Sequence, residues 1–148
     1  MARLPRLREI PTLMRAAALV CSVRLALWIV PFARLPRVVK FLARPRLARQ
    51  SYYSSDQLSW AVRAISRYVP RATCLTQALV LHIMLRQEGL PSRIRIGVSQ
   101  DAGHFEAHAW VECQDRVMIG DSGLRRYTPM MVWEGRHKAG GDRQARCR

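Results

Sequence analysis

A cysteine begins a predicted helix in the stretch Arg71-Ala72-Thr73-Cys74-Leu75-Thr76-Gln77-Ala78-Leu79. Pro70 ends the preceding helical pattern, Thr73 is a good N-cap, and Gly89 ends the apolar periodicity that follows. A thiol in the first turn of a helix lies at the positive end of the helix dipole, which favours the nucleophilic thiolate. Cys74 is therefore a candidate nucleophile. The alternative is a small, buried apolar residue, which is what most free cysteines are.

The sequence after this helix has the alternation that predicts β-strands. A strand is predicted over residues 92–98, and a hairpin over residues 105–112 and 117–121 with a four-residue loop, 113–116. Residues 127–133 are predicted to form a last strand or a covering segment. The chain is thus expected to be α+β, with the helix that begins at the cysteine packed against a small antiparallel sheet.

The register of the predicted hairpin brings two further polar residues together. If Glu112 pairs with Val117, His108 lies opposite Asp121, and directly opposed Cβ atoms stand about 4.5–5.5 Å apart. A carboxylate at that distance can accept from an imidazole N–H and orient the ring toward the cysteine. A one-residue slip in register would turn Asp121 to the other face. Taken alone, His108 is also consistent with a core histidine and Asp121 with a turn residue.

The order of these residues resembles the transglutaminase-like branch of papain-type thiol enzymes. The resemblance rests on the cysteine, the histidine within Ala107-His108-Ala109-Trp110-Val111-Glu112, and the aspartate on the next strand. More narrowly, that strand, residues 74–79, residues 85–90 and Ile96-Gly97-Val98 resemble the lasso-peptide biosynthesis B protein, in its protease half. This likeness runs over roughly residues 60–129 and implies a papain-like, transglutaminase-type fold.

The resemblance also implies an activity and a set of partners. The activity is proteolytic removal of the leader peptide from a ribosomally made lasso-peptide precursor. A separate leader-recognition protein presents the leader, and an ATP-dependent lasso cyclase closes the ring on the freed core. The implied roles are Cys74 as nucleophile, His108 as general base and acid, and Asp121 as the residue that orients the histidine. Asp115 competes for the last role, but it falls in the predicted hairpin loop.

Two other functions remain open on the same residues. A transglutaminase-like acyl transferase would use the same nucleophile and base but resolve the acyl-enzyme with an amine. A non-catalytic basic adaptor in a biosynthetic complex would not need the cysteine at all.

The chain of 148 residues is long enough for one domain with a single core. Three segments are expected. A basic helical N-terminal region (1–50) packs on the core, a transglutaminase-like cysteine peptidase core follows (51–134), and a polar flexible tail (135–148) ends the chain.

The positive charge is concentrated in the N-terminal region. The net charge is +15, of which residues 1–50 contribute +10, with eleven basic residues against Glu9 alone. An acidic peptide or protein, an anionic membrane surface and nucleic acid are the candidate partners for such a region. Nucleic acid is the weakest of these, because the arginines alternate with apolar residues and no nucleic-acid-binding motif is present.

An apolar segment, residues 16–32, lies within this basic region. Arg24 breaks it below the ~20 residues that span a bilayer, and no signal-peptide cleavage pattern follows it. Arg15 and Arg24 are nine residues apart and fall on opposite faces of a helix, which argues against a surface-lying membrane helix. A helix packed on the catalytic core is therefore expected. The expected location is cytoplasmic, with peripheral contact at the inner face of the membrane left open.

No cofactor and no metal are expected. His104, Glu106 and His108 would share one face of a strand, but their spacing differs from the His-Glu-x-x-His helix of zinc proteases.

Overall fold

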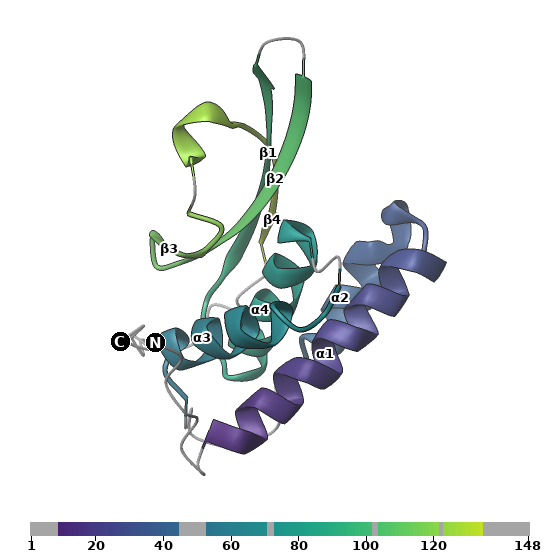
Figure 1. The fold of residues 1–148 in the computed structure, drawn as a ribbon, viewed down its shortest axis with the longest axis vertical. Helices are drawn as coiled ribbons and strands as arrows, with labels where there is room; N and C mark the ends of the chain where they lie inside the picture. Colours follow the sequence, from purple (N-terminus) through teal and green to yellow (C-terminus); the bar gives the residue numbers. More distant parts are fainter. Residues whose placement is uncertain (1–8, 45–52, 71–72, 102–103, 122, 135–148) are drawn as a thin grey trace.

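A computed structural model of the chain describes residues 9–44, 53–70, 73–101, 104–121 and 123–134. In this part of the chain, helices gather at one end of the molecule and an antiparallel sheet extends away from them (Figure 1). The strand order is β3-β2-β1-β4. The α+β class predicted from the sequence is therefore confirmed. The helices are α1 (Ile10–Ile29), α2 (Leu35–Leu42), α3 (Ser55–Ser66) and α4 (Cys74–Gln87), and the strands are β1 (Arg93–Asp101), β2 (His104–Cys113), β3 (Arg116–Ile119) and β4 (Thr128–Glu134).

Helix α4 is the centre of the core. It packs against α1, α3 and β2, and every residue from Ala78 to Leu85 is buried. A helix that is apolar on nearly all sides is stable only when it is covered on all sides. Its predicted ends are confirmed: the Thr73 side chain accepts from the backbone N–H of Thr76, and Gly89 follows the helix with φ of +76°.

Helix α1 joins the N-terminal part of the chain to this core, packing on α3 and α4. Arg15 reaches across to the C-terminal end of α4, where Nη1 lies 2.6 Å from Glu88 Oε1 and Nε donates to Gln87 Oε1 at 3.1 Å. The Arg15 and Glu88 side chains are only 15% and 13% exposed. The pair and its hydrogen bonds therefore fix the position of α1 on α4. The predicted tail, 135–148, lies outside the described residues.

The turn of the β2–β3 hairpin is shorter than predicted. Cys113 pairs with Arg116, so only Gln114 and Asp115 lie in the turn, in place of the four-residue loop 113–116. Both turn residues have positive φ, 48° and 62°, as a type I′ turn requires. Asn, Asp and Gly are the residues that usually indicate this turn. Because Gln114 occupies its first position, the sequence did not predict a two-residue turn.

The hairpin register agrees with the prediction only near the turn. Glu112 pairs with Val117 as predicted, but a bulge follows and Val111 lies opposite Ile119. Strand β3 ends at Ile119, so Asp121 lies beyond it. The predicted cross-strand pairing of Asp121 with the histidine is therefore wrong, and the bulge is the physical reason.

A buried histidine on α4 makes the stability of the fold depend on pH. His82 is 4% exposed, and its Nδ1 lies 2.9 Å from Ser92 Oγ. Burial, with a smaller contribution from the charge of Arg86, lowers the pKa of His82 to about 4.

His82 thus stays neutral in the folded protein, whereas the unfolded chain takes up a proton near pH 6.5. The contribution of neutral His82 to the free energy of unfolding is therefore fully present above pH 6.5. As the pH is lowered from 6.5 to 4, this contribution is lost, and the free energy of unfolding falls by about 3 kcal/mol. Urea unfolding of wild type and His82→Gln across this range measures the effect. The variant is expected to lose this part of the pH dependence, and equal slopes for the two proteins would contradict the assignment.

Candidate active site

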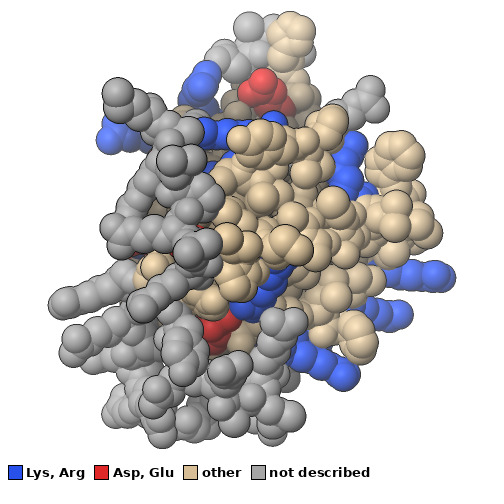
Figure 2. All heavy atoms as spheres, turned by 60° about the horizontal axis from the view of Figure 1, so that its bottom comes forward, with Lys and Arg blue, Asp and Glu red and all other residues tan. Residues whose placement is uncertain are grey.

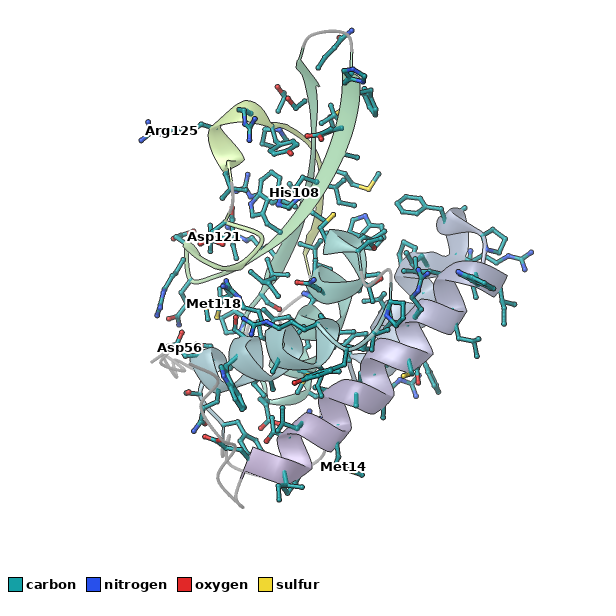
Figure 3. All side chains as sticks on the ribbon, in the orientation of Figure 1. Met14, Asp56, His108, Met118, Asp121 and Arg125 are labelled. Atoms are coloured by element: carbon teal, nitrogen blue, oxygen red, sulfur yellow. The ribbon has the colours of Figure 1, made fainter. Side chains whose placement is uncertain are left out.

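One cavity contains all three residues that the sequence singled out. Its volume is about 280 Å³, and it opens where the N-terminus of α4 meets β2 and the segment after β3. Figure 3 shows His108 and Asp121 between β2 and that segment. The residues that line the cavity are Arg63, Cys74, Gln77, His108, Ala109, Ile119, Gly120 and Asp121.

The cysteine in this cavity is a free, half-buried thiol. Cys74 is the first residue of α4, directly after the N-cap Thr73. At this position the thiol lies at the positive end of the dipole of a 14-residue helix. The first N–H groups of a helix have no carbonyl partner within the helix, so they can donate to a negative oxygen beside the thiol. Nucleophile and oxyanion donors thus come from the same helix turn.

A backbone carbonyl fixes the tautomer of the neutral histidine ring. His108 Nε2 lies 2.9 Å from the carbonyl oxygen of Gly120. A carbonyl oxygen can only accept, so Nε2 carries the proton, and Nδ1 of the neutral ring keeps its lone pair. The ring therefore has one nitrogen fixed by the backbone and the other available to accept a proton.

Two aromatic rings hold the plane of this imidazole. The centroid of the His108 ring lies 5.0 Å from that of Tyr127 and 6.4 Å from that of Trp110, with interplanar angles of 29° and 22°. The Trp110 ring and the Cβ of Tyr127 lie over Gly97, the β1 partner of His108: a Cβ there would stand 2.9 Å from Trp110 Cζ3 and 3.0 Å from Tyr127 Cβ. Only glycine leaves room for this packing.

The hydrogen bond on His108 Nε2 goes to a backbone carbonyl, whereas the sequence analysis predicted the Asp121 carboxylate in this place. Asp121 lines the cavity, but its side chain is 66% exposed and its Oδ1 lies 3.7 Å from Arg63 Nη2. The acceptor for His108 is the carbonyl of Gly120, one residue earlier. Gly120 has φ of +83°, and a Cβ would stand 2.8 Å from the carbonyl oxygen of Ala109, so only glycine fits. The sequence contains the glycine but gives no sign of which carbonyl faces the imidazole.

Asp115, His104 and Glu106 lie outside the cavity lining, whereas His108 belongs to it. The side chain of Asp115 is 94% exposed in the hairpin turn, 3.9 Å from Arg93. Glu106 accepts from the Tyr127 hydroxyl at 3.1 Å, and this hydrogen bond raises the pKa of Tyr127. Among the described residues, no group of three His, Cys, Asp or Glu side chains is arranged to hold a metal ion.

Arg63 is a cavity residue that sequence reasoning missed. It belongs to α3, and its Nη2 donates to the carbonyl of Met118 at 3.0 Å. Ser59, one helical turn earlier, donates to the same carbonyl at 2.7 Å. Two side chains of α3 therefore fix the end of β3, two residues before the carbonyl of Gly120 that holds the imidazole.

We expect these two donors to be partly redundant. Either Ser59→Ala or Arg63→Ala leaves one donor on the Met118 carbonyl, so each is expected to cost about 1 kcal/mol of unfolding free energy. The double variant leaves a buried carbonyl without a hydrogen-bond donor. Its loss of unfolding free energy is therefore expected to exceed the sum of the two single losses by about 1–3 kcal/mol. Urea unfolding of the four proteins measures this coupling.

Ser66→Ala is the matched control on the same helix. Ser66 is buried, and its hydroxyl has no hydrogen-bond partner among the residues the structure describes, so its removal is expected to be close to neutral. Strict additivity of the Ser59 and Arg63 substitutions would contradict a shared role at the Met118 carbonyl.

Of the comparisons with known proteins, the one with family models gives a match. A family model described as the transglutaminase-like superfamily matches residues 5–132. No curated protein and no solved structure gives a significant match. Members of this superfamily are commonly cysteine-type enzymes. The match therefore supports a protease or acyl-transferase type of activity. The match covers most of the chain, including the N-terminal helices and the sheet. The chain therefore belongs to the transglutaminase-like superfamily.

Proposed function

We propose that this protein is a cysteine peptidase that removes the leader peptide from a lasso-peptide precursor. The observation that carries the proposal is the shared cavity of Cys74 and His108, in which the imidazole has its proton on Nε2. That tautomer is the one a general base needs when its other nitrogen receives the proton of the thiol.

The proposed reaction has two steps. Cys74 transfers its proton to His108 Nδ1 and attacks the carbonyl of the scissile peptide bond, and N–H groups at the start of α4 stabilise the oxyanion. His108 then protonates the amine of the leaving core peptide, and the leader remains as a thioester on Cys74. In the second step His108 takes a proton from water, and the hydroxide displaces the thiolate. The products are a leader with a free carboxylate and a core with a free amine.

The choice of substrate rests on the sequence resemblance. Residues 74–79, 85–90 and 107–112 and Ile96-Gly97-Val98 resemble the protease half of the lasso-peptide B protein. A separate leader-recognition protein would present the precursor, and an ATP-dependent cyclase would act on the freed core.

Cleavage in oxygen-18 water tests the proposal directly. The full chain is incubated with a cognate precursor and its leader-recognition protein, and the products are analysed by mass spectrometry. We expect a leader fragment whose new C-terminal carboxylate carries one oxygen-18 atom, together with an unlabelled core fragment.

The same experiment separates the two alternatives. A leader joined to an amine, without the heavy isotope, would overturn hydrolysis in favour of acyl transfer. An intact precursor, with binding of the leader-recognition protein confirmed, would overturn the peptidase proposal in favour of a basic adaptor.

A further inference from the structure

Helix α1 presents an uncharged stripe to solvent along its whole length. The exposed residues recur every three or four positions, which places them on one face of the helix. The large apolar side chains of this outer stripe, together with Phe32 just beyond the end of α1, are between 43% and 74% exposed. Those on α1 are Ile10, Met14, Leu25, Trp28 and Ile29. Exposed apolar surface that is continuous over several helical turns marks a site where something else packs.

The charges that argued against such a stripe lie elsewhere. Arg15 turns inward to Glu88 and Gln87, where its side chain is 15% exposed. Arg24 is half-buried, and its guanidinium lies 5.9 Å from the centroid of the Trp28 ring. The exposed residues of α1 therefore carry no charge, and the nearest charge is that of the half-buried Arg24 beside Trp28.

A basic border lies beside the outer stripe, on the segment that follows α1. Arg34, Arg37, Lys40 and Arg44 are all exposed there, and residues 10–55 contain no Asp or Glu. Figure 2 shows a broad tan area on this face of the molecule, with Lys and Arg side chains projecting at its right and further blue atoms at its upper edge and in its lower part. Phe41 adds a further apolar side chain, 63% exposed, beneath the Arg44 guanidinium.

We propose that this face binds an anionic lipid bilayer surface, with α1 lying in the interface. The apolar side chains of the outer stripe enter the boundary between headgroups and acyl chains, and Trp28 lies at the headgroup level. Arg34, Arg37, Lys40 and Arg44 pair with lipid phosphates. An exposed helix bordered only by positively charged side chains fits the flat surface of an anionic membrane.

The structure also indicates why α1 lies on the membrane and does not cross it. By length and composition α1 is apolar enough to span a bilayer. However, its inner face is packed on α3 and α4, where Thr12, Ala16, Val20 and Val23 are buried. Insertion would expose that inner face and break the Arg15–Glu88 pair. The inference does not depend on the peptidase reaction.

Co-sedimentation with lipid vesicles tests the proposal. The full chain is mixed with vesicles of phosphatidylcholine alone, or of phosphatidylcholine with phosphatidylglycerol, at low and at high salt. We expect binding to the anionic vesicles, weakened by salt. The double variant Trp28→Glu, Ile29→Glu is expected to bind at least about tenfold more weakly. Arg37→Gln, Lys40→Gln is expected to lose roughly twentyfold or more on anionic vesicles.

Matched controls distinguish binding by this face from non-specific effects of net charge or of exposed apolar side chains. Phe105→Glu replaces an aromatic residue that is equally exposed on β2, and Arg125→Gln removes a charge from an exposed arginine near the sheet. Both controls, and Cys74→Ala, are expected to bind vesicles like wild type. Three outcomes would overturn the proposal. The wild-type protein could stay in solution, or the control variants could weaken vesicle binding as much as the test variants do. In the third, the Trp28 and Arg37 double variants bind vesicles as tightly as wild type. A concentration-dependent dimer that Trp28→Glu abolishes, without vesicle binding, would assign the face to a second copy.

Discussion

Replacement of Cys74 with alanine is expected to lower the rate of leader cleavage by at least roughly a thousandfold, because no other described residue that lines the cavity carries a thiol. Cys74 is the free thiol that lines the cavity with His108, at the first position of α4. Alanine favours a helix and keeps the half-buried site filled, so the fold is expected to survive. Single-turnover cleavage, followed by mass spectrometry, measures the effect.

Cys21→Ala is the matched control for this substitution. Cys21 is also a free cysteine, exposed on α1 and outside the cavity lining, so its removal is expected to leave the rate unchanged. Binding of the leader-recognition protein to Cys74→Ala should equal that of wild type, which shows that the variant is folded. A Cys74→Ala protein that still cleaves at a tenth of the wild-type rate would rule out the thiol mechanism.

The position of the nucleophile could be predicted because the rules that set it are local. Thr73 and Gly89 mark the two ends of α4 through capping, and capping depends on neighbouring residues alone. The apolar pattern between them required a covered helix, and the helix is covered. Strand positions were also predictable, because alternation along a strand reports its exposed and buried faces.

The partner of the histidine could not be predicted, because it depends on how the hairpin is closed. A two-residue turn with Gln114 and a bulge beside Glu112 end β3 at Ile119, and neither has a strong sequence signal. The acceptor is then a backbone carbonyl, that of Gly120, which no residue type encodes. The role of Arg63 could not be predicted for a related reason. Its hydrogen bond to the Met118 carbonyl depends on α3 lying beside the end of β3, which the sequence does not show.

Helix α1 packs on the core as predicted, and the spacing rule applied to its arginines was correct but incomplete. Arg15 and Arg24 do point in different directions, as their spacing requires. Sequence spacing could not show that Glu88 and Gln87 on a distant helix would accept from Arg15. With Arg15 held against α4 and Arg24 half-buried beside Trp28, the exposed residues of α1 carry no charge, and this is the premise of the proposed membrane contact.

Substitutions at His108 and Asp121 are expected to have very different effects on the same reaction. His108→Gln keeps a donor for the Gly120 carbonyl but cannot accept the proton of the thiol, so kcat is expected to fall about a thousandfold. Asp121→Asn removes only an exposed charge pair with Arg63, which is worth little, so kcat is expected to fall less than about tenfold. Steady-state cleavage rates measured across pH give both values.

The comparison decides which group orients the imidazole. If the Asp121 carboxylate held the His108 ring, Asp121→Asn would favour the wrong tautomer and lower kcat by roughly 10⁴-fold, as in enzymes with a Ser-His-Asp triad. If the Gly120 carbonyl holds it, the proton stays on Nε2 whatever occupies position 121, because a carbonyl oxygen can only accept. Asp115→Asn is the matched control, since it changes an exposed acid of the same hairpin outside the cavity lining. An Asp121→Asn variant as inactive as His108→Gln would therefore contradict orientation by the backbone and restore the aspartate to the triad.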